Sequence, residues 1–449
     1  MSRDPLAHPV TGYADIEHLL LSRVREDPRP YDARAAIAGV AVRALLARVG
    51  DPHLGMQFLH VAGSKGKGSV ALLAECLLRA DGHAVGTYTS PHLRRWNERI
   101  RIRGEAIADA ALAAALETLR PHVAALDAGE PALAPSFFDL VTAAGLLAFA
   151  RAGCRVAVLE AGLGGLYDAT NVVTPVACCI SSIELEHTDK LGATIEHIAR
   201  HKAGIIKTGV PVVTGALPPQ ALAVIAARCA AIGASELRLD RDWWLESCEQ
   251  GLASRRVLYR EAGRGGGYRS EFTLRHPAPH MALNAGLAIA LVRAAGWRAQ
   301  PQVLRGCALP GRGQVLRERP WIVIDAAHTP ASLQALARTL SAIPAAQRHF
   351  LVSLTRGKSP HALAALVGGC DSLTVTRADA LRSAPPGELA RELSRLLPAG
   401  TPRVVDDPRD ALRALIAALA DDALLCVCGS VYLAGVALGV LEDDGGATS

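Results

Sequence analysis

Apolar and polar positions follow two spacing patterns along the 449-residue chain. Between about residues 55 and 215, short runs of consecutive apolar residues, such as FLHVA, VAVLE and VACCI, alternate with longer stretches in which apolar residues recur every three or four positions. Consecutive apolar runs are typical of strands buried on both faces, and the longer spacing is typical of helices with one buried face. This half of the chain therefore predicts a doubly wound, mostly parallel α/β sheet with helices on both faces.

The predicted elements of this half follow one another in a regular order. Strands are expected at FLHVAG, AVGTYTS, RVAVLEAG, VACCISSI and GVPVVTG. Helices are expected at about 69–80, in FFDLVTAAGLLAFARAG and after GVPVVTG, and a polar loop is expected after AVGTYTS.

Residues 236–275 have a different pattern. The stretches WWLESCEQG, RRVLYREAG and YRSEFTLR predict short antiparallel strands. The glycine-rich GRGGGY between two of them predicts a hairpin loop rather than a nucleotide site, because no helix opens after it. A helix over about 281–295 closes this half.

A segment rich in Pro, Gly and Arg, WRAQPQVLRGCALPGRGQVLRERP, then leads to a second alternating series. In it, WIVIDAAH, HFLVSLT, SLTVTRA, RVVDD and LLCVCGS are each followed by a helical stretch, which predicts a smaller, Rossmann-like α/β domain. We therefore expect two domains, over 1–300 and 317–449, with a linker over 301–316.

Residues 423–441 carry no charge and approach the length of a membrane span. However, Cys428-Gly429-Ser430 divides them into a strand-like half and a helical half rich in small residues. A buried strand–turn–helix is therefore favoured over one continuous membrane helix.

Composition narrows the class of protein. A formal net charge of +5 is too modest for a nucleic-acid binder and suits small anionic ligands. The ten cysteines lie mostly in apolar segments without metal-ligand spacing, which predicts reduced, buried thiols rather than disulfides or zinc sites. The N-terminus lacks the apolar core of a signal peptide. We expect a cytoplasmic protein that binds neither nucleic acid nor membrane.

The stretch HVAGSKGKGSV at 60–70 is the first candidate for chemistry. An apolar run, a glycine-rich loop, lysines and then a helix form the geometry that directs backbone N–H groups at a phosphate. The spacing differs from the common phosphate-loop motif, because Gly68 separates Lys67 from Ser69. The stretch nevertheless predicts an N-terminal domain like that of P-loop ATPases.

Further motifs follow in order: SPHLRRWNERIRIRG (90–104), VLEAGLGGLYDATNVV (158–173), HTDKLGATIEHIARHKAGIIKTGVPVV (187–213), GRGQVL (311–316), VIDAAHTPASL (323–333) and CGSVYLAG (428–435). With the phosphate loop, they resemble the folylpolyglutamate synthase/dihydrofolate synthase family of the Mur ligase superfamily. The resemblance extends from about residue 13 to about 440 and implies a monomer.

The resemblance implies an ATP- and Mg²⁺-dependent ligase that phosphorylates a carboxylate and lets an amine attack the acyl phosphate. It implies catalytic roles for Lys67, Lys202 and His187. The implied ATP contacts are Lys65, Gly66, Lys67, Gly68, Ser69, Asn284, Arg312 and Asp325. The implied metal ligands are Ser90, Glu160, His187 and Lys202, the last as a carbamate.

Without the family resemblance, several of these residues would be interpreted as ordinary structural or surface residues. His187 alone would be an ordinary histidine, because imidazole is not a typical Mg²⁺ ligand. Lys202 alone would be a solvated lysine, and Arg312 could be an exposed linker residue. Lys65 stands where many relatives carry Asn, and its tip could lie in solvent.

For a pterin substrate, the resemblance implies contacts from Ser136, Phe138, Asp139, Tyr167 and Asp168. Phe138 could stack on a flat heterocycle, and the carboxylates could bond its ring N–H groups. Phe138 at the start of an amphipathic helix is also a natural core residue.

The chain departs from the family pattern at a few positions. These are Leu166 for Arg, Glu186 for Asp, His201 for Glu, Thr329 for Asn, and Met281 for Gln. None removes a phosphate-loop or metal group, so the departures bear on substrate preference more than on reaction type.

The predicted function is addition of L-glutamate to dihydropteroate, to the glutamate tail of folate, or to both. Another Mur-type ligase with a different acceptor is one alternative. A uridine-nucleotide ligase would normally have an extra N-terminal domain, and about sixty residues before the loop are too few for one. A non-catalytic nucleotide-binding descendant is the other alternative.

Overall fold

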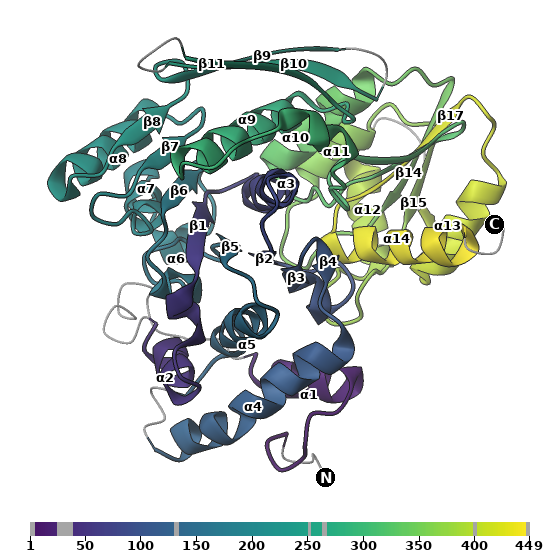
Figure 1. Cartoon of the computed structure of the whole chain (residues 1–449). Helices are drawn as coiled ribbons and strands as arrows, with labels where there is room; N and C mark the ends of the chain where they lie inside the picture. The colour runs from purple at the N-terminus through teal and green to yellow at the C-terminus, as the bar shows by residue number, and fades with distance from the viewer. Residues whose placement is uncertain are drawn as a thin grey trace. The chain divides into compact units, whose positions relative to one another are not determined.

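The computed structural model describes residues 5–24, 39–129, 134–249, 253–262, 267–397 and 402–445. The chain divides into two compact units. The first comprises Met1–Glu246, Leu258–Phe272 and Leu283–Cys307, and the second comprises Ser247–Val257, Thr273–Ala282 and Ala308–Ser449. Each unit has its own large sheet (Figure 1). The predicted two-domain α/β class is confirmed.

The sheet of the first unit has eight strands in the order β4-β3-β2-β5-β1-β6-β7-β8. The bounds are β1 Gln57–Ala62, β2 Val85–Tyr88, β3 Ile100–Ile102, β4 Glu105–Ala106, β5 Val156–Glu160, β6 Ala177–Ile180, β7 Val212–Thr214 and β8 Glu236–Arg238. From β2 to β8 every pairing is parallel, and β3 and β4 join antiparallel at one edge. Strands β2, β5 and β6 are buried along their whole length, which explains their continuous apolar runs.

Helices cover both faces of this sheet. They are α1 Tyr13–Ser22, α2 Val40–Arg48, α3 Lys67–Ala80, α4 Asp109–Ala128, α5 Phe137–Arg151, α6 Thr188–Leu191, α7 Ile195–Ala203, α8 Pro219–Ile232 and α9 Pro279–Ala294. The connection through α3 runs in the opposite direction across the sheet from those through α5, α7 and α8. Because such crossovers are right-handed, α3 lies on the opposite face from these three helices. This is the predicted doubly wound arrangement.

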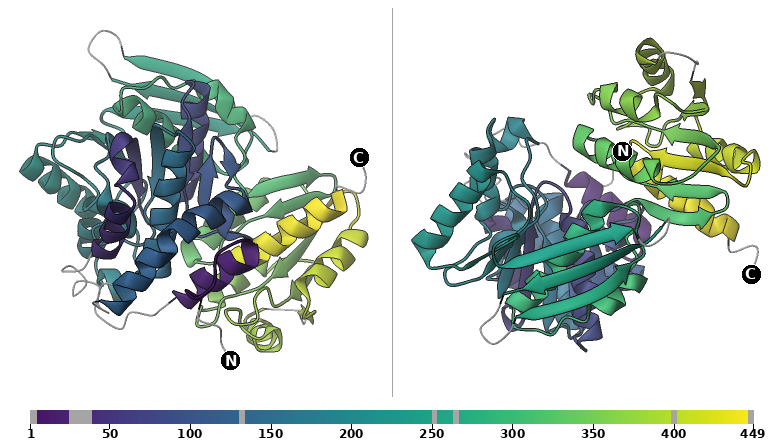
Figure 2. Two further views of the ribbon diagram at one scale, coloured as in Figure 1. Left: turned by 60° about the horizontal axis from the view of Figure 1, so that its bottom comes forward. Right: turned by 90° about the horizontal axis from the view of Figure 1, so that it is seen from above.

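A separate three-stranded antiparallel sheet has the order β11-β10-β9. Its strands are β9 Trp243–Glu249, β10 Arg255–Glu261 and β11 Tyr268–Leu274, and Figure 2 shows them side by side. Gly286 of α9 packs directly against the side chains of Trp243 and Leu245. The strands were predicted, whereas most of the predicted hairpin loop between β10 and β11 lies outside the described residues.

The second unit has six strands in the order β12-β13-β17-β14-β15-β16. Its elements are β12 Gln314–Glu318, β13 Trp321–Ile324, α10 Pro330–Ser341, β14 Gln347–Val352, α11 His361–Val367, β15 Ser372–Val375, α12 Pro386–Leu396, β16 Arg403–Val404, α13 Pro408–Ala417, β17 Ala423–Cys428 and α14 Val431–Gly445. All five predicted strand–helix pairs are present. The antiparallel edge strand β12 was not predicted and begins inside the expected linker segment.

The uncharged stretch at 423–441 forms β17 and most of α14, as predicted. Within the described part of the chain, no helix combines the length and the apolar character needed to cross a membrane.

Two expectations were wrong. The polar stretch after β2 is not all loop, because it contains the 3-10 helix Trp96–Arg99 followed by β3 and β4. The thiols are not all unpaired, because Cys76 of α3 and Cys307 form a disulfide with their Cα atoms 6.4 Å apart. The two cysteines are 231 positions apart, so sequence spacing could not indicate that the fold brings them together.

We expect removal of this disulfide by Cys76→Ser to lower the free energy of unfolding of the first unit by about 3–5 kcal/mol, because a crosslink across a long loop restricts the unfolded chain strongly. Urea denaturation under oxidising conditions measures the difference. Cys370→Ser, at a partly buried free thiol, is the control and should leave it unchanged. Equal stability of oxidised and fully reduced wild type would contradict the prediction.

Candidate active site

Four segments meet at one edge of the first sheet because they follow neighbouring parallel strands. Strands β2, β5, β1 and β6 are adjacent in that order, so their carboxyl ends lie along the same edge. Ser90 lies just after β2, Glu160 ends β5, the loop 63–66 follows β1, and residues 181–187 follow β6. Open α/β sheets bind ligands at this edge, where connections reverse direction.

The loop 63–66 is held by the segment after β6. The Lys65 backbone N–H donates to Ser182 Oγ at 2.8 Å, and Ser181 Oγ donates to the Lys65 carbonyl at 2.6 Å. A Cβ on Gly63 would lie 2.0 Å from Ser181 Oγ, and Gly66 has a left-handed φ of +81°. Both glycines are therefore required by this close, tight turn.

Helix α3 begins at Lys67, immediately after the turn. Its first backbone N–H groups, including those of Gly68 and Ser69, are the ones for which a helix has no carbonyl partner of its own. Lys67 Nζ donates to the Gly63 carbonyl at 2.9 Å, so the ammonium group lies over the loop. Backbone donors, a helix N-terminus and an ammonium group together make an anion cradle.

The carboxylate of Glu160 lies beside this cradle. A Cβ on Gly68 would lie 3.1 Å from Glu160 Oε2, so the glycine allows the close approach. The same oxygen accepts the Ser90 backbone N–H at 2.8 Å. Glu160 is only 4% exposed. The structure therefore brings Ser90, Glu160 and the phosphate loop together.

Asn284 of α9 also lies against the loop, at Gly66. It is 7% exposed, and a Cβ on Gly66 would lie 2.5 Å from Asn284 Oδ1. The structure therefore places this predicted nucleotide contact directly against the phosphate loop.

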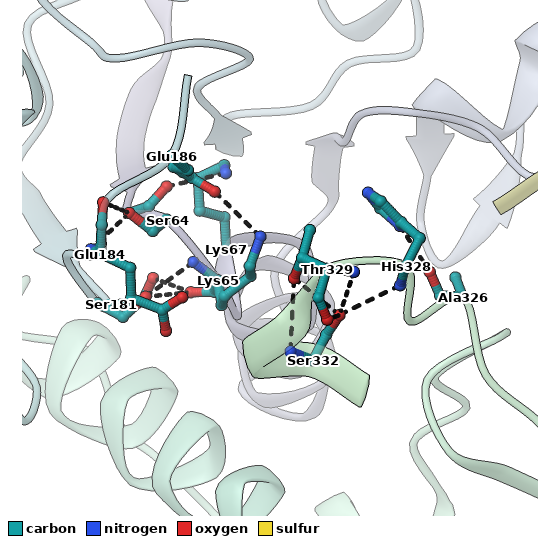
Figure 3. A network of polar contacts seen from close by, with 12 residues as sticks. Ser64, Lys65, Lys67, Ser181, Glu184, Glu186, Ala326, His328, Thr329 and Ser332 are labelled. Carbon is teal, nitrogen blue, oxygen red and sulfur yellow. Dashed lines mark hydrogen bonds and ion pairs between the residues drawn. The ribbon is translucent and has the colours of Figure 1, made fainter. Parts of the chain in front are cut away.

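The Glu186 carboxylate contacts two of the lysines at this edge. Its Oε2 accepts from Lys65 Nζ at 3.0 Å (Figure 3). Its Oε1 lies 3.4 Å from Lys202 Nζ. The Lys65 side chain is 34% exposed and that of Lys202 only 2%. Lys65 is thus paired rather than extended into solvent, and no motif indicated that Glu186 would be its partner.

Burial and the neighbouring charges shift the pKa values of the groups at this edge. Burial lowers the pKa of Lys202 to about 7, and repulsion from Lys67 adds to this, while Glu186 partly opposes it. For Glu186, burial favours the protonated form, but attraction to Lys202, Lys65 and Lys67 outweighs it and holds the pKa below its usual value. Lys202 is therefore partly a neutral amine near pH 7, facing an ionised carboxylate.

His187 lies in the exposed turn that precedes α6. Its φ of +48° is uncommon for a residue with a side chain. Partial desolvation lowers its pKa, and Lys202 and Lys67 also lower it against the opposing effect of Glu186. The imidazole is therefore neutral at pH 7, which leaves a nitrogen able to act as a ligand or accept a proton.

Two departures from the family pattern meet beside Lys202. The Leu166 backbone N–H donates to the His201 carbonyl at 2.8 Å, and the rings of Tyr167 and His201 are 5.6 Å apart. A Cβ on Gly204 would lie 2.4 Å from Leu166 Cα. The loop carrying Leu166 and Tyr167 is therefore packed closely on the end of α7 that carries Lys202.

Ser136 and Asp139, both expected to contact a pterin, form the N-terminal capping box of α5. Ser136 Oγ donates to Asp139 Oδ2 at 2.6 Å and accepts the Asp139 backbone N–H at 3.2 Å. Burial raises the pKa of Asp139 despite these bonds. The structure thus shows a helix-capping use for both side chains.

Asp168 organises the loop after β5. Its Oδ2 accepts the backbone N–H groups of Gly162 and Leu163 at 3.0 Å, and its Oδ1 accepts the backbone N–H and the hydroxyl of Thr170. Each carboxylate oxygen has about two lone-pair sites, so these four bonds occupy most of its capacity. Burial also raises the pKa of Asp168.

Phe138 packs against the same loop. A Cβ on Gly162 would lie 2.5 Å from Phe138 Cζ, and the Tyr88 ring is edge-on with its centroid 6.0 Å away. Asp168 and Phe138 are therefore brought together through Gly162, although the carboxylate faces the loop backbone.

The second unit holds Arg312 and Asp325. Asp325, just after β13, accepts the Ala327 backbone N–H at 2.6 Å. Burial raises the pKa of Asp325 to about 6, although Arg312 opposes the shift electrostatically. His276, which the sequence did not single out, bonds to the Arg312 carbonyl. No motif marks this histidine, because its partner lies 36 residues away.

The departure at Thr329 preserves a structural role. Thr329 is the N-cap of α10, and its Oγ1 accepts the Ser332 backbone N–H (Figure 3). Pro330 follows at the first helical position. Threonine and asparagine are both good N-caps. The change from the family's Asn therefore keeps the start of this helix.

Comparison with known proteins first gives the class. Residues 311–431 match the family described as Mur ligase, glutamate ligase domain. A phosphate loop on a doubly wound sheet, followed by this domain, is the organisation of a Mur-type ligase.

The relatives then narrow the family. The folylpolyglutamate synthase of Lacticaseibacillus casei is 38% identical over 67% of this chain and 71% of its own length. The dihydrofolate synthase/folylpolyglutamate synthase of Mycobacterium tuberculosis is 33% identical over 98% of this chain and 96% of its own. A crystal structure of Mycobacterium tuberculosis folylpolyglutamate synthase complexed with ADP and AMPPCP has a TM-score of 0.85 at 31% identity, over 97% of this chain and 99% of that one. The chain belongs to the folylpolyglutamate synthase/dihydrofolate synthase family.

We expect Gly66→Ala to destabilise the first unit by about 1–2 kcal/mol more than Gly82→Ala. Both glycines have left-handed φ, but only at position 66 would the new Cβ meet Asn284, whereas no heavy atom lies within 4 Å at position 82. Urea denaturation of the two variants isolates the contact with Asn284. Equal losses would show that the loop and α9 do not constrain each other.

Lys202 should make stability depend on pH. Because its folded pKa of about 7 lies below the ordinary lysine pKa of 10.5, the unfolded chain binds more protons between these values. Its destabilising effect is therefore full below pH 7 and disappears as the pH rises towards 10.5, amounting to roughly 3–5 kcal/mol. The free energy of unfolding, measured in CO₂-free buffer, should rise over this window in wild type relative to Lys202→Met. Parallel pH curves would contradict the prediction.

Proposed function

We propose that this protein is an ATP-dependent ligase that adds L-glutamate to dihydropteroate, to the glutamate tail of folate, or to both, through an acyl phosphate. The observation that carries the proposal is the anion cradle of α3 with the Glu160 carboxylate beside it. The names of the relatives support the substrate class, and the crystal structure with ADP and AMPPCP supports the nucleotide.

In this proposal the loop N–H groups and Lys67 hold the β- and γ-phosphates of ATP. The fixed donors stabilise the negative charge that develops as the terminal phosphoryl group moves to the substrate carboxylate. Lys65 is close enough to add a second positive charge, shared with Glu186. The glutamate amine then attacks the acyl phosphate, forming the amide and releasing phosphate.

The residues beside the cradle fit a magnesium ion. Glu160 and Ser90 offer oxygen donors next to the phosphate loop, which is what a hard cation prefers, and Mg²⁺ usually keeps few protein ligands. We propose Glu160, Ser90 and His187 as ligands, and Lys202 as a further ligand after carbamylation. When bound, Mg²⁺ neutralises phosphate charge and helps to align the terminal phosphate.

Lys202 has the environment that carbamylation needs. Its amine is buried and partly neutral near pH 7, so it can attack CO₂, form a C–N bond and release a proton. Glu186, 3.4 Å away, can accept that proton or pass it to solvent.

For the acceptor, we propose that Phe138 and Tyr167 provide aromatic surface, with Ser136, Asp139 and Asp168 shaping the pocket through the cap of α5 and the loop after β5. Asn284 is proposed to contact the adenine, and Arg312 and Asp325 other parts of ATP. We further propose that the enzyme acts as a monomer in the cytoplasm, as the family resemblance implies.

A paired assay tests the proposal. Phosphate release from ATP should require both glutamate and a pterin acceptor, with dihydropteroate and tetrahydrofolate tried separately. Lys67→Met should lower turnover at least about a thousandfold, or about 4 kcal/mol, because the terminal phosphate loses its ammonium partner. Lys190→Met, at an exposed lysine of α6, is the matched control and should remain active. ATP use that ignores both acceptors would instead favour another Mur-type ligase.

A further inference from the structure

A buried histidine, His276, contacts the backbone of Arg312 inside the expected linker segment 301–316. His276 follows β11, is 5% exposed and belongs to the second unit together with Arg312. Its Nε2 lies within hydrogen-bond distance of the Arg312 carbonyl, and its Nδ1 lies 3.1 Å from the Ala278 backbone nitrogen.

These two contacts determine the tautomer of the ring. The Ala278 N–H can only donate, so Nδ1 must be the unprotonated acceptor. The ring proton is then on Nε2, and this N–H donates to the Arg312 carbonyl. Burial lowers the pKa of His276 to about 4, so the ring keeps this neutral form at physiological pH.

His276 holds the Arg312 carbonyl in a loop whose N–H groups are bonded elsewhere: that of Gly311 donates to Gln314 Oε1 at 3.0 Å, and that of Arg312 donates to the Leu309 carbonyl at 3.3 Å. Gly311 and Gly313 flank Arg312, and both have left-handed φ, +62° and +59°. The Gly311 carbonyl accepts the Ala326 N–H at 2.8 Å, which fixes one side of Arg312. A Cβ on Gly313 would lie 3.0 Å from His276 Cε1, so the imidazole ring packs against the other side.

We propose that His276 is a positioning residue for Arg312: its Nε2–H holds the Arg312 peptide so that the guanidinium is presented, beside Asp325, for nucleotide binding. The inference rests on the nucleotide contact proposed above for Arg312. An arginine between two glycines would otherwise lose backbone and side-chain freedom each time nucleotide binds. Because His276 already holds the Arg312 peptide in place, less conformational freedom is lost when nucleotide binds. We therefore expect the contribution of His276 to appear in the affinity for nucleotide.

Two variants separate the hydrogen bond from the packing. His276→Phe keeps an aromatic ring of similar volume but lacks the N–H, whereas His276→Gln can place an amide N–H where Nε2 lies. We expect His276→Phe to weaken binding of AMPPCP, measured by calorimetry on the full chain, about tenfold. His276→Gln should recover most of the affinity, and His349→Phe, a control in β14 of the same unit, should not change it.

A double-mutant cycle makes the role specific. In an Arg312→Ala background, His276→Phe should have no further effect on AMPPCP affinity, because the group that it positions is gone. The KM for ATP should rise in His276→Phe, while the KM values for glutamate and acceptor stay within about twofold.

Two results would overturn the proposal and leave His276 with a purely structural role. One is additive effects of the two substitutions on AMPPCP affinity, and the other is an equal rise in KM for all three substrates. Because AMPPCP binding needs no turnover, absence of ligase activity would count against the proposed reaction and not against the role of His276. A wild type that binds no AMPPCP would overturn both.

Discussion

Three lysines lie at one edge of the sheet of the first unit, and the Glu186 carboxylate reduces the electrostatic repulsion among them. Lys65 and Lys67 lie at the phosphate loop and Lys202 lies on α7, and the three ammonium groups repel one another. Glu186 contacts two of them directly and lowers the electrostatic cost of all three. The pKa of Lys202 still falls to about 7, mainly because the amine is buried and in addition because Lys67 repels its charged form. A polyphosphate would supply the negative charge that this edge still lacks, so the same repulsion favours the ligand.

The arrangement depends on strand order, which pattern alone does not give. Alternating apolar runs and helical stretches predicted the elements of both sheets and the phosphate loop at the end of the first strand. They did not reveal that β5 lies between β1 and β2, which is what sets Glu160 beside Gly68. Long-range neighbours of this kind, like the Cys76–Cys307 pair or His276 and Arg312, are products of tertiary packing, so no local spacing encodes them.

Some local sequence patterns were present but fitted two roles, a structural one in a helix cap or a turn and a role in substrate binding. Ser136 and Asp139 stand three positions apart before an apolar run, which is the spacing of a capping box, and the structure shows them in that role. Asp168 likewise bonds to Thr170 and to nearby backbone N–H groups, as turn aspartates often do. Residues that shape a loop or start a helix can hold a pocket wall rigid without touching what the pocket contains.

The departures from the expected family pattern fall into two groups: those that keep a structural or chemical role, and those that change which groups could contact a substrate. Thr329 starts its helix as an asparagine would, and Glu186 still supplies a carboxylate next to His187, so neither changes the chemistry available at the site. Leu166 and His201 are a different case, because charged residues were expected at both positions. The structure has an exposed apolar side chain on a loop packed against α7, and a buried ring within α7 itself, the helix that carries Lys202. Loss of a cation and of an anion at adjoining positions leaves the net charge of this corner nearly unchanged while removing groups that could bind a charged substrate tail. We infer that the phosphate chemistry follows the family, while the choice among acceptors depends on groups other than the charged side chains expected at these two positions.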